Sequence, residues 1–171
     1  FYSTLREWMK SAHPDDFEKM VDLVGRQKDR EYRVLGDPFI HAILPLLPED
    51  DQGLLLDLGQ KAFREDFGFT PKGLWLPETA VSSATLDKAK EVGYEFVVLR
   101  DDQIALPPEV KKEQPVFVSL PSGGEMGVFW FETSESGKVA FDDGETINAD
   151  SFLRKRQNSQ EQLAVGVDME T

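Results

Sequence analysis

The stretch "GLWLPETAVSSATLDKAKEVGYEFVVL", residues 73–99, carries the pattern that decides the fold of this chain. Its two apolar ends, Gly73–Leu76 and Glu95–Leu99, have the composition of short buried strands. Between them the spacing of apolar residues predicts a helix over Ser83–Val92, which Gly93 ends. A strand, a helix and a second strand in so short a stretch form a βαβ unit, in which the two strands run parallel.

Helical and extended patterns also alternate upstream of this unit. In chain order they predict a helix over Tyr2–Val24 broken at His13-Pro14, a strand at Glu31–Leu35, and a helix from a cap at Asp50 or Asp51 to Phe67. Gly68, directly after the last helix, is a natural stop because glycine tolerates the left-handed backbone that ends many helices.

The second half of the chain begins with a hairpin pattern. Two β-rich runs, Pro115–Leu120 and Met126–Phe131, are separated by the turn sequence "PSGG". A polar helix over Ala149–Gln162 and a strand at Leu163–Val167 are expected to follow. The sequence contains no repeat or linker. We therefore expect a single domain over residues 1–171, of the α/β class, with a small antiparallel β insertion.

Composition narrows the classes of function. The chain has no cysteine, which removes disulfides and thiol nucleophiles, and only two histidines, which disfavours a multi-histidine metal centre. Its 32 acidic residues against 19 basic ones give a net charge of −13, which disfavours nucleic acid as a partner. No apolar stretch reaches the roughly 18 residues of a membrane span, so no membrane partner is expected. A neutral polar substrate fits this charge, although a surface charged only for solubility fits it equally well.

Carboxylates follow two of the expected strands. In parallel α/β folds functional groups gather at the carboxyl ends of strands, which draws attention to Glu78 after Leu76. Asp168 and Glu170 follow the strand Leu163–Val167 and share one face if that strand continues. Glu78 can instead lie in the first turn of a helix, where a carboxylate interacts favourably with the helix dipole. Asp168 and Glu170 can simply be solvated at the end of a strand. If these carboxylates act together, they suit glycoside hydrolysis, in which two carboxyl groups flank the glycosidic bond that is cleaved.

Two other residues accompany these strands. His41 stands in the apolar segment Ile40–Leu47, where a lone histidine is more often structural than catalytic. Trp75 precedes Glu78 and suits either the core or a platform on which a sugar ring stacks. No serine stands in a G-x-S-x-G context, so a serine hydrolase has no support from the sequence.

Three motifs occur in a recognisable order. They are "FIHAILPLL" at Phe39–Leu47, "FGFTPKGLWLPETAVSSATLDKAKEVGYEFVVLRDDQ" at Phe67–Gln103 and "VGVDMET" at Val165–Thr171. They resemble, respectively, the H-x-I-L-P-L segment, the W-x-P-E segment and the start of the D-x-E-T-F-G motif of glycoside hydrolase family 57. Three motifs in the family's order are more specific than any one of them.

The resemblance implies a retaining glycoside hydrolase or glucanotransferase that acts on α-glucans, built on an incomplete (β/α)7 barrel. By motif position Glu78 matches the catalytic nucleophile and Asp168 the general acid/base. His41, Trp75 and Glu170 match positions near the substrate subsites. The implied partner is an oligosaccharide or polysaccharide, no metal or other cofactor is implied, and we expect a cytoplasmic protein.

The resemblance also bears on completeness. The family's opening motif is absent and the chain ends inside the third motif, so we expect residues 1–171 to be a fragment of a larger catalytic barrel. Whether the fragment is active alone stays open.

Two alternatives to a family 57 glycosidase are kept. Asp102 stands where related sequences often carry His, and Glu132 lacks a nearby Arg-Asp pair, as a non-catalytic carbohydrate-binding or regulatory paralogue would. A polysaccharide deacetylase-like enzyme would need a metal held by Asp and closely spaced histidines, which two histidines hardly supply.

Overall fold

The structure, a computed structural model, describes residues 2–27, 29–103, 115–133 and 136–137 and the single positions 105, 108 and 110. The chain divides into two compact units, Phe1–Val98 with Phe117–Val128, and Leu99–Val116 with Phe129–Thr171. The helix predicted over Ala149–Gln162 and the strand predicted at Leu163–Val167 lie outside the described residues.

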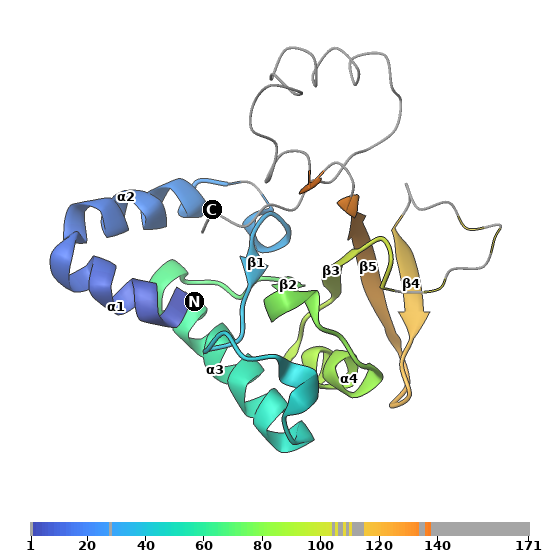
Figure 1. The fold of residues 1–171 in the computed structure, drawn as a ribbon. Coiled ribbons are helices and arrows are strands. Elements are labelled where there is room, and N and C mark those ends of the chain that lie inside the picture. Colours follow the sequence, from blue (N-terminus) through green and yellow to red (C-terminus); the bar gives the residue numbers. More distant parts are fainter. Residues whose placement is uncertain are drawn as a thin grey trace, which may run out of the picture. The chain divides into compact units, whose positions relative to one another are not determined.

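The first unit is built around a mixed sheet of five strands (Figure 1). Each of the five strands has at least some of its residues in this unit. The strands are β1 (Leu35–Gly36), β2 (Gly73–Trp75), β3 (Phe96–Arg100), β4 (Val116–Ser119) and β5 (Glu125–Phe131), in the spatial order β1-β2-β3-β5-β4. Strands β1, β2 and β3 are parallel, with Leu74 opposite Gly36 on one side and Val97 on the other. A tight turn, in which Leu120 N donates to Gly124 O at 3.1 Å, reverses the chain between β4 and β5.

Helices precede and connect these strands. They are α1 (Tyr2–Ala12), α2 (Pro14–Gly25), α3 (Glu49–Phe67) and α4 (Ser83–Val92), with 3-10 turns η1 (Arg30–Tyr32), η2 (Leu44–Leu46) and η3 (Pro77–Thr79). Helices α3 and α4 lie next to each other, and α1 and α2 form an outer pair (Figure 1). Among the described helices, none is both long and apolar enough to cross a membrane.

The βαβ unit predicted from residues 73–99 is confirmed. Strands β2 and β3 pair in parallel, with Gly73 opposite Phe96, and α4 connects them. Ser82 caps this helix by accepting a hydrogen bond from Thr85 N at 3.1 Å. Gly93 ends it with φ of 108°, a left-handed conformation that glycine adopts without strain.

Two predictions upstream need correction. The strand predicted at Glu31–Leu35 is wrong over most of its length, because residues Arg30–Tyr32 form a 3-10 turn and β1 is Leu35–Gly36. The cap predicted at Asp50 or Asp51 is also wrong, since α3 begins at Glu49 and both residues lie inside its first turn. Their carboxylates still favour the positive end of the helix dipole there.

The core forms where α3, α4 and the parallel strands meet. Leu56, Leu74 and Tyr94 are fully buried in it. A Cβ at Gly36 would lie 2.6 Å from the Tyr94 hydroxyl, so only glycine lets β1 approach this ring. Burial, together with the nearby Asp37 carboxylate, raises the pKa of Tyr94 above its ordinary value, so the phenol remains neutral.

Two glycines of α3 provide a matched stability test. A Cβ at Gly59 would collide with the backbone oxygen of Asp37, whereas a Cβ at Gly53 would meet only Lys88 Cδ at 3.5 Å. We expect Gly59→Ala to lower the free energy of unfolding by about 1–3 kcal/mol through this overlap. We expect Gly53→Ala to raise it by about 0.5–1 kcal/mol through the better helix propensity of alanine. Urea unfolding measures both, and equal effects of the two substitutions would contradict the close approach at Gly59.

Candidate functional site

Glu78 projects from the carboxyl end of β2. It lies in the turn η3 between two buried residues, Pro77 and Thr79, yet its own side chain is 69% exposed. Its backbone is left-handed, with φ of 55° and ψ of 15°, and Thr79 follows with φ of 51°. Such conformations cost roughly 1–3 kcal/mol each for residues other than glycine, and they concentrate at functional sites. The turn therefore presents a carboxylate to solvent at an energetic cost.

Short hydrogen bonds hold this turn. Thr79 N donates to Leu76 O at 2.8 Å, and the Thr79 hydroxyl donates to Glu78 O at 2.7 Å. Helix α4 starts only at Ser83, so Glu78 does not lie in its first turn. The helix-terminus alternative therefore does not apply to α4. Glu78 follows Pro77 in the one-turn element η3, where its own torsion angles are non-helical.

His41 is the residue that the structure brings to Glu78. It lies in the segment after β1, and its Nε2 atom approaches Glu78 Oε1 to 3.6 Å. Glu78 follows β2, as the strand-end argument predicts, and His41 lies in the segment that follows the neighbouring parallel strand β1. Both are solvent-accessible, 44% for His41, so the contact adds little to stability. A carboxylate beside an imidazole at such an edge can act as a nucleophile or a base.

A buried polar network joins the two segments that carry this pair. Thr85 of α4 donates its hydroxyl to Gln52 Oε1 at 2.7 Å, and Gln52 Nε2 donates to Leu47 O at 2.9 Å. Thr85 also contacts Ser82 through its hydroxyl at 2.8 Å. Both Gln52 and Thr85 are almost fully buried, so each needs the other as a hydrogen-bond partner. The sequence predicts neither residue as part of the site, because the cap at Ser82 concerns only the backbone N–H of Thr85.

The structure says less about the other predicted site residues, Trp75, Asp168 and Glu170. Trp75 is half-buried in β2, so stacking on a sugar stays a prediction. Asp168 and Glu170 lie outside the described residues.

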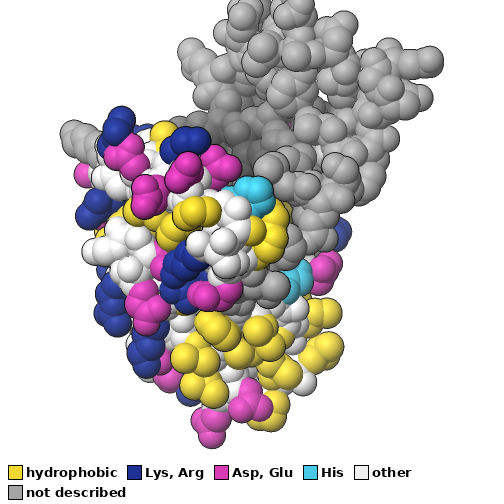
Figure 2. All heavy atoms as spheres, turned by 90° about the vertical axis from the view of Figure 1, so that its left-hand side faces the viewer, with side chains coloured by type: hydrophobic (Ala, Val, Ile, Leu, Met, Phe, Trp, Pro, Cys, Tyr) yellow, Lys and Arg dark blue, Asp and Glu magenta, His cyan; other side chains and the backbone are white. Residues whose placement is uncertain are grey.

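Exposed apolar residues, Ile40 and Leu46 among them, flank His41 in the sequence. In a space-filling view, hydrophobic side chains gather over the lower part of one face (Figure 2).

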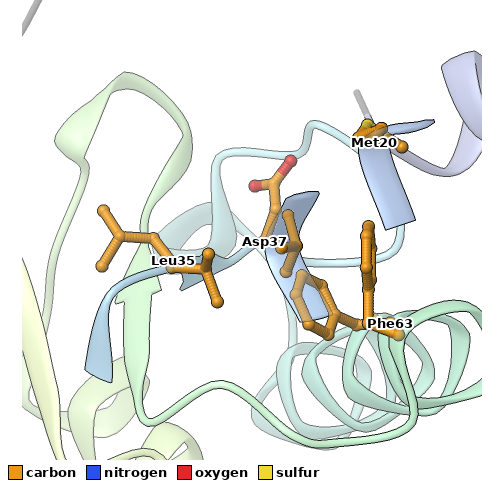
Figure 3. Close-up of a pocket in the computed structure, with 8 residues that line it drawn as sticks. Met20, Leu35, Asp37 and Phe63 are labelled. Carbon is orange, nitrogen blue, oxygen red and sulfur yellow. The ribbon is translucent and has the colours of Figure 1, made fainter. Parts of the chain in front are cut away.

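A pocket of about 310 Å³ opens elsewhere in the first unit (Figure 3). Met20 from α2, Leu35 from β1 and Phe63 from α3 contribute to its largely apolar wall, in which Asp37 is the charged residue. Neither Glu78 nor His41 lines it, so it is distinct from the strand-end pair. In the described part of the chain, no three His, Cys, Asp or Glu side chains are arranged to hold a metal ion.

Comparison with protein families decides what the chain is. The sequence profile described as "Glycosyl hydrolase family 57" matches residues 1–171, the whole chain. The chain belongs to glycosyl hydrolase family 57. The resemblance predicted from the three motifs is thereby confirmed, and membership supports a glycoside hydrolase or transglycosylase.

Curated relatives agree with this family. An alpha-amylase 1 from Dictyoglomus thermophilum is 31% identical over 101 residues, which cover 59% of this chain and 14% of that protein. A 4-alpha-glucanotransferase from Thermococcus litoralis is 26% identical over 140 residues, 81% of this chain and 18% of that protein. The chain thus spans less than a fifth of the length of these relatives.

Solved structures share the fold. The 4-alpha-glucanotransferase from Thermococcus litoralis superposes with a TM-score of 0.76 at 19% identity, covering 98% of this chain and 26% of that one. A family 57 branching enzyme from Thermococcus kodakaraensis gives 0.56 at 18% identity, covering 82% and 30%. At these identities the superpositions establish the fold alone.

Proposed function

We propose that the protein is a retaining glycoside hydrolase or glucanotransferase of α-glucans, with Glu78 as nucleophile and Asp168 as general acid/base. The observation that carries this proposal is the exposed Glu78 carboxylate, held on a left-handed turn at the carboxyl end of a parallel strand. Family membership supports it, as do relatives named alpha-amylase, 4-alpha-glucanotransferase and branching enzyme.

The proposed mechanism has two displacements at the anomeric carbon. In the first, a Glu78 oxygen bonds to C1 while the bond from C1 to the leaving sugar oxygen breaks, and Asp168 gives its proton to that oxygen. In the second, the Asp168 carboxylate takes a proton from water or a sugar hydroxyl, whose oxygen bonds to C1 and releases Glu78. Two inversions leave the configuration of C1 unchanged.

The same proposal includes the architecture around the site. We infer that β1, β2 and β3 with their helices belong to an incomplete (β/α)7 barrel. The parallel order of these strands and the superposition on the Thermococcus litoralis enzyme support this inference. A barrel brings the carboxyl ends of its strands to one face, where Trp75 and Glu170 would contact the sugar and His41 would lie beside the Glu78 carboxylate.

The stereochemistry of the first product tests the proposal. Full-length protein is incubated with maltooligosaccharides or amylose, and proton NMR follows the new reducing ends before they mutarotate. We expect the α-anomer to appear first, because retention follows from a double displacement. Appearance of the β-anomer first, or no turnover of any α-glucan, would overturn the proposal. Product lengths in the same samples separate hydrolysis from sugar transfer.

A further inference from the structure

His41 and Glu78 form a pair whose geometry is set by the surrounding fold. Phe39, two residues before His41, donates its backbone N–H to Leu55 O of α3 at 2.9 Å. Beyond His41, Leu47 O accepts the buried amide of Gln52 at 2.9 Å. The segment is thus fastened to the same helix on both sides of the imidazole, which fixes where its ring can reach.

The other end of the pair is fastened to the same helix. Gln52 accepts the hydroxyl of Thr85 at 2.7 Å, and Thr85 in turn contacts the cap residue Ser82 at 2.8 Å. Ser82 follows the turn that bears Glu78. One buried side chain of α3 therefore supports both segments, although His41 and Glu78 themselves are exposed to solvent.

We propose that His41 is a positioning residue for Glu78, an inference that rests on the proposed function of Glu78 as nucleophile. The imidazole Nε2 lies beside Oε1. In the proposed role it restrains the carboxylate through this oxygen, and the other oxygen, Oε2, attacks the anomeric carbon. The 3.6 Å separation of Nε2 and Oε1 exceeds a hydrogen bond, and such contacts commonly tighten when substrate binds. In this role His41 acts only through Glu78 and does not contact the reacting atoms.

A positioning role and a substrate contact predict different kinetics. A residue that binds sugar equally in the ground and transition states raises KM when it is removed, with kcat unchanged. A residue that aims the nucleophile lowers kcat, because misplacement by about 1 Å can cost roughly 100-fold. For His41→Ala we expect kcat to fall by roughly 10- to 100-fold with little change of KM.

Two further variants sharpen the kinetic test. His41→Gln places an amide N–H near the position of Nε2, and we expect it to recover part of the lost kcat. His13→Ala is the matched control, because His13 is 48% exposed and lies 4.0 Å from Asp16. We expect it to leave kcat and KM as in the wild type, since it removes a similar histidine–carboxylate pair at the junction between α1 and α2.

An NMR experiment reads the pair without any turnover. In protein labelled at histidine Cε1, His41→Gln and His13→Ala assign the signals of these two histidines. We expect Glu78→Gln to shift the His41 signal and leave that of His13 in place, and Asp16→Asn to do the reverse. An unmoved His41 signal in Glu78→Gln would show that the two side chains do not interact.

The kinetic outcomes separate this inference from the proposed function. If Glu78→Gln abolishes turnover but His41→Ala keeps kcat, or raises only KM, the positioning role alone is overturned. If Glu78→Gln turns over like the wild type, Glu78 is not the nucleophile and both fail. A selective loss of kcat in His41→Ala, restored in part by His41→Gln, supports the inference.

Discussion

Glu78→Gln is expected to lower kcat/KM on maltooligosaccharides by on the order of 10⁴-fold. Losses of this size are typical when one residue of a catalytic group that includes the nucleophile is removed. The amide carries no negative charge and cannot form the glycosyl ester. Because the side chain is 69% exposed, the free energy of unfolding should stay within about 0.5 kcal/mol of the wild type. Steady-state kinetics and urea unfolding measure the two effects.

The control for this substitution is Glu65→Gln. The side chain of Glu65, in α3, is also 69% exposed, and it pairs with Arg6 at 3.1 Å rather than with a residue of the proposed chemistry. We expect its turnover to equal that of the wild type. Similar losses in both variants would point to a general effect of removing an acidic surface charge.

Glu78→Gly tests the strain and the nucleophile together. Glycine adopts the left-handed backbone of this turn freely, so this variant should be no less stable than the wild type while losing its activity. Azide can enter the space that the carboxylate leaves and attack C1 from the same side. We expect a β-glycosyl azide from an activated α-glucosyl substrate such as the fluoride. Recovery of an α-azide would contradict attack from the Glu78 side.

The sequence was most informative where local chemistry decides the structure. Helix α4 begins after the capping Ser82 and ends before Gly93, and both signals are visible without any tertiary contact. The bounds predicted for strand β1 are wrong because the conformation of the preceding residues depends on contacts with residues far away in the sequence. Glu31 O accepts from Lys72 N at 2.7 Å and Tyr32 donates its hydroxyl to Glu95 at 3.2 Å, which favours a turn over the predicted strand.

The candidate site shows the same division. Strand-end reasoning selects Glu78, and the parallel pairing of β1 and β2 explains why His41 lies near it. The left-handed backbone at Glu78 and Thr79 has no sequence signal, because glycine and asparagine are the residues expected there. The Gln52–Thr85 hydrogen bond joins residues far apart in the chain, so only the packing of α3 on α4 reveals it.

Asp168→Ala is expected to lower kcat on maltooligosaccharides by roughly 10²- to 10⁴-fold, which is the usual contribution of a general acid. The leaving sugar oxygen then departs without a proton. α-Glucosyl fluoride needs no proton to lose its leaving group, so the first step with this substrate should be slowed far less. Rapid-quench measurement of fluoride release separates this first step from the breakdown of the intermediate. Asp16→Asn, at a 61% exposed carboxylate on α2, serves as the control.

Azide also tests the second step in Asp168→Ala, because azide attacks C1 without help from a base. Here Glu78 is still present and forms the glycosyl ester, so azide must attack from the opposite face. We expect an α-glycosyl azide from Asp168→Ala and, as argued above, a β-glycosyl azide from Glu78→Gly. Opposite anomers assign the two carboxylates to opposite sides of the sugar ring, as a retaining mechanism requires. The same anomer from both variants would contradict the assignment of roles.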